Sequence, residues 1–488
     1  MKNNKFNFLR YTLLLGFILL ISFSCEREIS DDARDATFAT TGEIFTDTPV
    51  GMGSNFYFPY GPDANNPVGS KFTAWSVDEN VSYKGNASMR FDVPNANDPE
   101  GNYAGGILRI DGAGRDLSGY DALTFWAKAS QGAVVGEFGF GEDFFPNKYI
   151  TTITNVSLGT TWKKYIIPIP DASKLVQERG MFRYAAGSQA TNNLGYTFWI
   201  DELKFEKLGT IGQARPSIAN GVNRTINSFV GITIPLADLK ETFNLPNGLD
   251  QVVFPAPAYF VFKSSNPAVA SVNANGQISV LAAGTTVITA NIGGTLNPIT
   301  NEFDGGIDAI DSITINSQGA FTLAPIPTRD PSRVLSIFSD TYTNVPVAYY
   351  NGFWLPGSTT GSADFSVNGN NILNYTTFNY VGIATSNPTL NCTAMTRVHF
   401  NMYVPNVPSN FDFLISIEDW GANQVDNGGD DTRQQIFVPR AQVQPNTWIT
   451  IDAPLTLTNK NNIGLIIMEN INGSSLTNFY MDNIYFYN

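Results

Sequence analysis

Two strings of residues occur twice in this chain, and they constrain its fold more than any other feature. The string IFTDT returns as IFSDT, and the string WIDELKF returns in related form as YMDNIYF. IFTDT and WIDELKF stand at the beginning and the end of one segment, and IFSDT and YMDNIYF stand at the beginning and the end of another. The sequence therefore predicts two copies of one module, with opening strings at 44–48 and 337–341, closing strings at 199–205 and 480–486, and modules at 42–208 and 320–488.

Each closing string carries a carboxylate among apolar residues. Side chains alternate between the two faces of a β-strand, so every second residue shares a face. An inward carboxylate is costly unless a cation or several donors satisfy it, and its recurrence predicts a shared structural requirement. The residues predicted on one buried face are Trp199, Asp201, Leu203 and Phe205 in the first copy, and Tyr480, Asp482, Ile484 and Phe486 in the second.

The N-terminus has the pattern of an export signal. Three basic residues precede a short apolar run at 11–23, which is typical of a signal peptide at 1–24. Cys25 follows at the position of a lipobox cysteine, and residues 26–41 resemble the acidic export signal of Bacteroidota lipoproteins. We expect an acylated Cys25 and an acidic tether at 25–41, anchored to the outer membrane and facing the cell exterior. Ordinary secretion with an incidental cysteine is the alternative.

Composition indicates an all-β chain and argues against nucleic acid. The 488 residues include 43 Gly and 27 Pro, and no stretch shows sustained helical periodicity. The formal net charge of -14 would be repelled by phosphate backbones. Apart from Cys25 the chain has only Cys392, so no disulfide within the fold is predicted, and a buried thiol is expected.

The segment at 210–316 differs from both copies. KSSNPAVASV at 263–272, NGQI at 275–278 and AGTTVITA at 283–290 alternate between apolar and polar residues and are broken by Asn-Pro and Asn-Gly turns. This combination resembles the bacterial immunoglobulin-like group 2 domain. The resemblance implies a small β-sandwich that acts as a spacer.

The flanking modules resemble carbohydrate-binding modules with the galactose-binding-like jelly roll. The resemblance rests on SGYDALTFWAKAS, TWKKYIIPIP and YTFWIDELKFEK in the first module, and on VLSIFSDTYTNVPV, TWITIDAP and FYMDNIYFYN in the second. It implies that the first and last strands lie together, near a structural Ca²⁺ site, and Ca²⁺ is a cation that seeks oxygen ligands. The alternative is that each Asp accepts backbone N–H bonds in a turn. The implied metal ligands are Asp47 and Asp201 in the first module, and Asp340 and Asp482 in the second.

Aromatic loops are the candidate glycan contacts. Each opening strand is followed by an aromatic segment punctuated by Pro and Gly, and a flat ring offers dispersion to a pyranose face. Neighbouring amides such as Asn65, Asn66, Asn351 and Asn379 would fix hydroxyls. The alternative is that these rings close the ends of the sandwiches. The predicted glycan-binding residues are Trp354, Tyr350, Tyr349, Tyr57 and Tyr60, with Trp420, Phe144 and Phe145 from second loops.

Catalysis finds little support in the sequence. The single histidine, His399, lies within a predicted strand, so neither a His-based triad nor a His metal cluster can form. We expect a non-catalytic surface lipoprotein that captures polysaccharide, with a β-glucan such as laminarin as the family-level expectation, and supplies an importer complex. A glycan-active lyase or hydrolase with an appended binding module is one alternative, and a surface adhesin is another.

Overall fold

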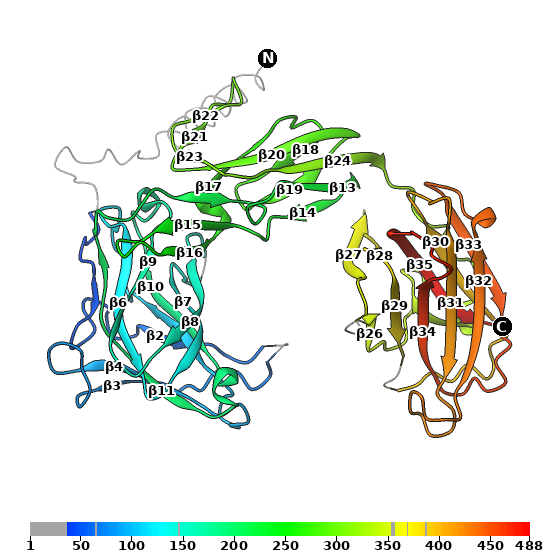
Figure 1. Cartoon of the computed structure of the whole chain (residues 1–488), viewed down its shortest axis with the longest axis horizontal. Helices are drawn as coiled ribbons and strands as arrows, with labels where there is room; N and C mark the ends of the chain where they lie inside the picture. The colour runs from blue at the N-terminus through cyan, green and yellow to red at the C-terminus, as the bar shows by residue number, and fades with distance from the viewer. Residues whose placement is uncertain (1–36, 64–65, 145–146, 353–356, 368, 386–387) are drawn as a thin grey trace, which may run out of the picture. The chain divides into compact units, whose positions relative to one another are not determined.

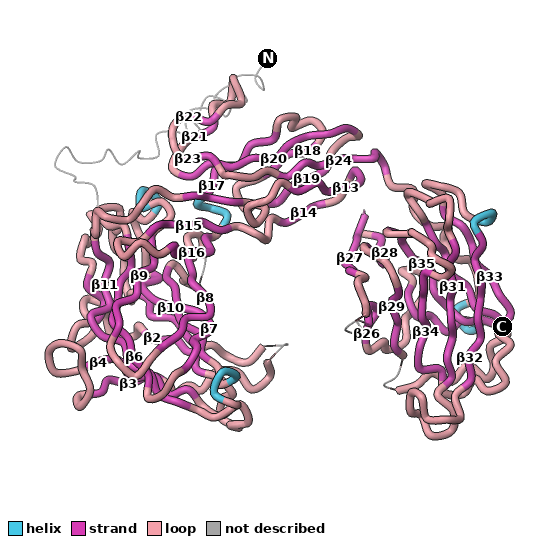
Figure 2. Tube along the Cα trace, viewed as in Figure 1, coloured by secondary structure: helices cyan, strands magenta, loops and turns pink. Residues whose placement is uncertain are grey.

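The computed structural model describes residues 37–63, 66–144, 147–352, 357–367, 369–385 and 388–488 (Figures 1 and 2). These residues form strands joined by loops and by five 3-10 helices of three residues each, η1 (Ala172–Lys174), η2 (Gln189–Thr191), η3 (Pro257–Tyr259), η4 (Pro331–Arg333) and η5 (Arg440–Gln442). The described chain contains no α-helix, which confirms the all-β prediction. None of its helical segments could cross a membrane. Cys25 lies outside the described residues.

The chain divides into two compact units, one of residues 1–147 with 154–209 and one of 148–153 with 210–488. The first unit is a sandwich of two antiparallel sheets. One sheet has the order β3-β4-β11-β6-β9, with β1 also paired to β11, and the other contains β8-β7-β10-β5-β2. The strands are β1 (Glu43–Phe45), β2 (Tyr57–Pro59), β3 (Trp75–Asp78), β4 (Ser88–Val93), β5 (Ala104–Arg109), β6 (Ala122–Ala129), β7 (Ala133–Phe140), β8 (Thr151–Leu158), β9 (Lys163–Pro168), β10 (Gly180–Ala186) and β11 (Tyr196–Glu206).

The middle domain is an immunoglobulin-like sandwich. A sheet of order β13-β24-β20-β17, with β23 at β20, accompanies a second sheet of order β14-β19-β18. Gly276 has φ +69° in the predicted Asn-Gly turn, a conformation that glycine adopts without strain. The strands are β12 (Arg215–Ser217), β13 (Arg224–Val230), β14 (Thr233–Pro235), β15 (Lys240–Asn244), β16 (Asp250–Pro255), β17 (Phe260–Ser264), β18 (Ala270–Val272), β19 (Gln277–Val280), β20 (Gly284–Ile292), β21 (Thr295–Leu296), β22 (Phe303–Asp304), β23 (Ile307–Asp308) and β24 (Ile313–Ala320).

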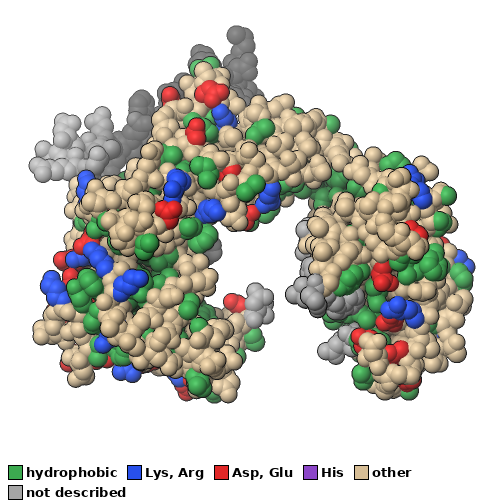
Figure 3. Space-filling view, in the orientation of Figure 1, with side chains coloured by type: hydrophobic (Ala, Val, Ile, Leu, Met, Phe, Trp, Pro, Cys, Tyr) green, Lys and Arg blue, Asp and Glu red, His purple; other side chains and the backbone are tan. Residues whose placement is uncertain are grey.

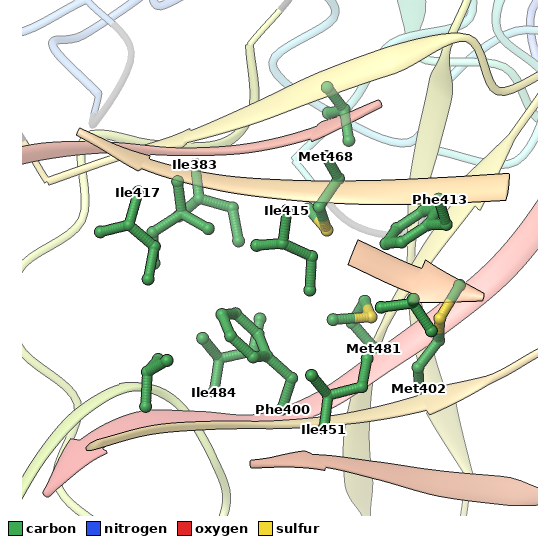
Figure 4. Packing of buried hydrophobic residues seen from close by; sticks show 14 of the residues in the cluster. Ile383, Phe400, Met402, Phe413, Ile415, Ile417, Ile451, Met468, Met481 and Ile484 are labelled. Atoms are coloured by element: carbon green, nitrogen blue, oxygen red, sulfur yellow. The ribbon is translucent and has the colours of Figure 1, made fainter. Parts of the chain in front are cut away.

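The C-terminal jelly roll repeats the arrangement of the first module. Its sheets have the orders β27-β28-β35-β30-β33, with β25 paired to β35, and β26-β29-β34-β31-β32. Figure 4 shows Phe400 and Met481 facing Ile415 from opposite sheets across the buried core. The strands are β25 (Val334–Phe338), β26 (Tyr349–Gly352), β27 (Gly361–Val367), β28 (Asn370–Thr376), β29 (Tyr380–Ala384), β30 (Arg397–Tyr403), β31 (Asp412–Asp419), β32 (Thr432–Pro439), β33 (Trp448–Pro454), β34 (Ile463–Asn470) and β35 (Asn478–Tyr487).

The closing strand β11 contains a β-bulge at Asp201 and Glu202. Its register against β6 shifts after Asp201, and Glu202 has φ +50°. The extra residue reverses the alternation of side chains. Ile200 and Asp201 are therefore both buried, whereas Trp199 is partly exposed on the outer face. The prediction that Trp199 shares the inner face is wrong, because it assumed a regular strand.

The bulge marks the point at which the closing strand changes its neighbour. Before the bulge β11 pairs with β4, and after it with β1. In the second copy β35 pairs first with β28 and then with β25, and Asn483 at its bulge has φ +49°. The expected pairing of first and last strands is confirmed in both modules. The repeated Asp sits at this exchange of strands, which gives the sequence repeat a structural reason.

Candidate functional site

The outer face of the sheet β8-β7-β10-β5-β2 is hollowed at two places. Strand register puts Phe58 opposite Ile107, and Ile107 opposite Arg183, on this outer face. The first hollow has a volume of about 240 Å³. It joins the two aromatic loops that the sequence proposed separately in the first module. Its lining residues are Phe58, Pro59, Tyr60, Gly61, Ile107, Glu142, Asp143, Phe144 and Asn147.

A charged network fixes the polar groups beside this hollow. The Tyr60 hydroxyl donates to Glu142 Oε2 at 2.7 Å. Arg183 lies 3.0 Å from Glu142 Oε2 and 2.7 Å from Glu137 Oε1. Burial raises the pKa of Tyr60, so its hydroxyl stays protonated. The carboxylates are thus held by a fixed guanidinium, and a pre-oriented acceptor loses little entropy when it binds a hydroxyl.

Two phenylalanines and an arginine form the outer rim of the same hollow. The rings of Phe58 and Phe144 meet edge to face with centroids 4.8 Å apart. The Arg109 guanidinium carbon lies 4.8 Å from the Phe144 centroid, and its Nε lies 2.5 Å from Asp143 Oδ1. The Phe144 side chain is 51% exposed. An exposed ring held in place is a surface on which an apolar sugar face can rest.

The second hollow, of about 460 Å³, is lined by amides and small residues. Asn66 and Asn102 exchange side-chain hydrogen bonds of 2.8 and 3.0 Å. A Cβ on Gly105 would lie 2.6 Å from the Tyr103 ring and 2.9 Å from the Tyr60 ring, so glycine lets both rings lie against the sheet. Of the residues that line this hollow, only Asn66 was predicted from the sequence. Its lining residues are Asn66, Ala96, Asn102, Tyr103, Gly136, Ala185, Ala186, Gly187 and Gln189.

Three residues of this second hollow were not predicted from the sequence: Asn102, Tyr103 and Gln189. The adjacent glycines Gly105 and Gly106 were the available signal, because glycine inside a strand marks a close approach of other groups. No local pattern indicated which side chains would approach them.

The other predicted contacts of the first module have different surroundings. The Tyr57 hydroxyl lies 2.9 Å from that of buried Tyr184, and its ring packs beside Trp75. Burial raises the pKa of Tyr57. This placement corresponds to the alternative in which a ring closes the end of the sandwich. Phe145 lies outside the described residues, as does Asn65.

In the second jelly roll the predicted aromatic residues are spread over several surroundings. The Tyr350 hydroxyl donates to the Ile337 carbonyl at 2.9 Å, and its ring packs against the core. Tyr349 is 36% exposed. Trp420 packs against Leu465 and its neighbours on the outer face of the sheet. Trp354 lies outside the described residues. A glycan contact by any of these residues stays a prediction.

The first pair of predicted metal ligands is occupied by backbone N–H groups. Asp201 accepts from the amides of Tyr83, Lys84 and Glu202 at 2.7, 3.0 and 2.7 Å. Asp47 accepts from two further amides of the same loop, Asn86 and Ala87, and these bonds lower its pKa. N–H groups already supply the positive partners that Ca²⁺ would supply. The residues of the first module therefore do not fit a calcium site.

The second pair has a different electrostatic environment. Burial and the nearby charge of Asp340 raise the pKa of Asp482 to about 7. Asp482 accepts from its neighbour Asn483 at 2.6 Å, and Asp340 accepts from the amide of Asn371 at 2.5 Å. No group of three or more His, Cys, Asp or Glu suited to a metal occurs among the described residues. Two mutually repelling carboxylates nevertheless form a donor pair that a hard cation stabilises.

We expect calcium to act on the second jelly roll alone. Adding Ca²⁺ to chelated protein should raise the melting temperature of its second jelly roll, because Asp482 would ionise against a cation instead of against Asp340. Differential scanning calorimetry checks this. The Asp482→Asn variant should lose the response, and Asp201→Asn should keep it. An unchanged melting curve in the wild type would contradict the calcium prediction.

Two family models match parts of the chain. Residues 45–207 match the family described as carbohydrate binding domain 30. Residues 257–294 match the family described as intimin, immunoglobulin-like domain. The protein combines a carbohydrate-binding domain with an immunoglobulin-like part. Both hollows lie within the stretch 45–207 that matches the first family. The assignment of the immunoglobulin-like part to bacterial group 2 stays a prediction.

Solved structures that resemble the chain include several carbohydrate-binding modules. The family 30 module of a cellulosomal cellulase of Clostridium thermocellum is 21% identical, covers 34% of this chain and 96% of its own, and gives a TM-score of 0.25. The family 11 module of another cellulosomal cellulase of that organism is 16% identical, covers 34% of this chain and 96% of its own, and gives a TM-score of 0.23. A tandem of two family 22 modules from Paenibacillus barcinonensis is 10% identical, covers 93% of this chain and 99% of its own, and gives a TM-score of 0.21. No curated protein matches the chain significantly.

Proposed function

We propose that the protein is a non-catalytic lipoprotein on the outer surface of the outer membrane, where it captures polysaccharide for an uptake system. The observation that carries the proposal is the hollowed outer face of β8-β7-β10-β5-β2, which lies within the stretch matching a carbohydrate-binding family. A β-glucan such as laminarin is the proposed ligand class. The signal-like N-terminus and Cys25 support the anchor.

The chemistry of this face suits a neutral glycan. Rings from Phe58, Tyr60 and Phe144 supply apolar surface, and the amides of Asn66 and Asn102 supply paired donors and acceptors. The fixed carboxylates accept hydroxyl hydrogens without carrying unpaired charge into the groove. Charged side chains of both signs are interspersed on the face of the molecule that Figure 3 shows.

The same network supports binding without hydrolysis. A glycosidase needs one carboxyl group as a general acid and a second carboxylate opposite it. Burial raises the pKa of Glu137, but the charge of Arg183 opposes this shift and the same guanidinium also holds Glu142. Two carboxylates tied to one guanidinium are poorly placed for separate roles in proton transfer. Release of reducing ends from any glycan would contradict the non-catalytic part of the proposal.

We expect Phe144→Ala to weaken binding of neutral glycans by about tenfold, the loss for one aromatic contact of roughly 1.5 kcal/mol. Affinity gel electrophoresis on a panel that includes laminarin measures this loss. Melting temperature should stay unchanged because the Phe144 side chain is 51% exposed.

Phe72→Ala is the matched control for this variant. Phe72 is 61% exposed in the same module and lines neither hollow. We expect this variant to retain full binding. An equal loss in both variants, or no retardation of the wild type by any glycan on the panel, would refute the proposed face.

A further inference from the structure

A second aromatic surface lies on the other sheet of the first module. Tyr83, Trp126, Trp162 and Trp199 surround Lys128, and we call these five residues the Lys128 face. Tyr83 stacks on Trp126 with centroids 3.9 Å apart and planes 13° apart. The Lys128 ammonium lies 5.4 Å from the Trp162 centroid and 5.2 Å from that of Trp199. β6 and β11 belong to the sheet that does not carry the two hollows.

The Lys128 ammonium lies among aromatic rings. Within the described part of the chain, no carboxylate lies at ion-pair distance from its Nζ, whereas Arg90 and Lys164 on the same sheet each pair with a carboxylate. Trp199 is oriented by a 2.9 Å hydrogen bond from Nε1 to Asp78. The chain has a net charge of -14, yet this ammonium has no carboxylate partner in the described ranges, so it is available to bind an anionic ligand.

The buried carboxylate of Asp201 builds this face. It accepts hydrogen bonds from the backbone amides of Tyr83 and Lys84. These bonds fix the loop that carries the Tyr83 ring over Trp126. The Tyr83 side chain remains 41% exposed. The repeated Asp of the first module thus acts as a positioning residue for an exposed ring.

In the second jelly roll the corresponding surface is covered by other aromatic side chains. Its Tyr403 lies opposite Tyr480, just as Lys128 lies opposite Trp199. The rings of Phe229 and Phe321 pack onto these tyrosines, and Tyr480 is only 5% exposed. The second jelly roll therefore uses its equivalent of the Lys128 face to pack against aromatic residues of its own unit. Among the residues that the structure describes, only the first copy combines partly exposed rings with an ammonium that has no carboxylate partner.

We propose that the Lys128 face is a second carbohydrate-binding site, which takes an acidic sugar unit of a polysaccharide. The anionic group, a carboxylate or a sulfate ester, pairs with the Lys128 ammonium. Rings of the face give the sugar its apolar contact. The charge complementarity selects an anionic glycan over a neutral one. This site is separate from the two hollows and does not depend on their ligand.

The experiment is affinity electrophoresis of the full chain in gels containing polygalacturonate, a sulfated galactan or laminarin. We expect retardation in at least one acidic gel, and the two acidic gels distinguish a carboxylate from a sulfate. Lys128→Gln should weaken that retardation by about tenfold, as for loss of one charge-assisted contact, and Lys128→Arg should retain it. Added salt should weaken acidic binding in the wild type more than in Lys128→Gln. Tyr83→Ala should also weaken it.

Lys163→Gln is the matched control, because Lys163 is exposed on neighbouring β9 and lies over the ring of Tyr165 outside the face. It should bind acidic gels as the wild type does. Phe144→Ala should lose retention only in laminarin, which separates failure of the hollows from failure of this site. The proposal is overturned by unretarded wild type in both acidic gels, or by equal losses in Lys128→Gln and Lys163→Gln. It is also overturned if Lys128→Gln changes only self-association in sedimentation, since the occupant would then be protein.

Discussion

Raising the pH from about 4 to 8 in a chelating buffer is expected to remove the stabilisation that protonated Asp482 gives the second jelly roll, about 4 kcal/mol of unfolding free energy. Burial and the charge of Asp340 raise the pKa of Asp482 from its ordinary 3.8 to about 7. The folded protein therefore holds this proton more tightly than the unfolded chain. The stabilisation is complete below the unfolded pKa and is lost as pH rises through the folded one.

Urea unfolding at several pH values, followed by the tryptophan fluorescence of the second jelly roll, measures this change. The Asp482→Asn variant keeps a neutral group in place and should flatten the pH dependence of that transition. Glu178→Gln is the matched control, because burial also raises the pKa of Glu178 to about 7, but in the first module. If Asp482→Asn retains the full pH dependence, the ionisation of Asp482 is not its source.

The Asp201→Ala variant is expected to lose about 3 kcal/mol of stability in the first module, since three amide donors lose a charged acceptor. The loop bearing Tyr83 should also loosen, which would weaken acidic-glycan binding at the Lys128 face. Urea unfolding gives the stability, and near-ultraviolet circular dichroism reports the loss of ring stacking.

Asp116→Ala provides the comparison for Asp201. Asp116 also accepts a hydrogen bond from a backbone amide, that of Ser118, but it lies in an exposed turn. We expect a much smaller loss of stability from this variant than from Asp201→Ala. Equal effects of the two substitutions would show that the buried carboxylate does not hold the strand exchange together.

Fold class and the duplication follow from sequence alone, because both are local patterns repeated along the chain. The strings around Asp47 and Asp201 return around Asp340 and Asp482. Each pair lies where the closing strand exchanges one neighbour for another. The same backbone irregularity needs the same acceptor, so the sequence shows the repeat even where it does not show the bulge.

The loops of the candidate site were also predictable, but the orientation of their rings was not. Tyr57 and Tyr60 belong to one aromatic segment, yet Tyr57 reaches the hydroxyl of buried Tyr184 while Tyr60 lines the outer hollow. Strand alternation gives two faces without saying which one meets the opposite sheet. That choice depends on the residues that the rest of the fold brings there.

Sequence by itself determined an all-β chain with two related modules, an immunoglobulin-like insert and aromatic loops suited to sugars. Only the tertiary structure decided that Trp199 faces outward and that Lys128 stays open while Tyr403 is covered by Phe321. The physical reason is that a one-residue bulge inverts every later side chain of a strand. Burial of a surface ring, in turn, depends on groups distant in sequence that come to lie against it.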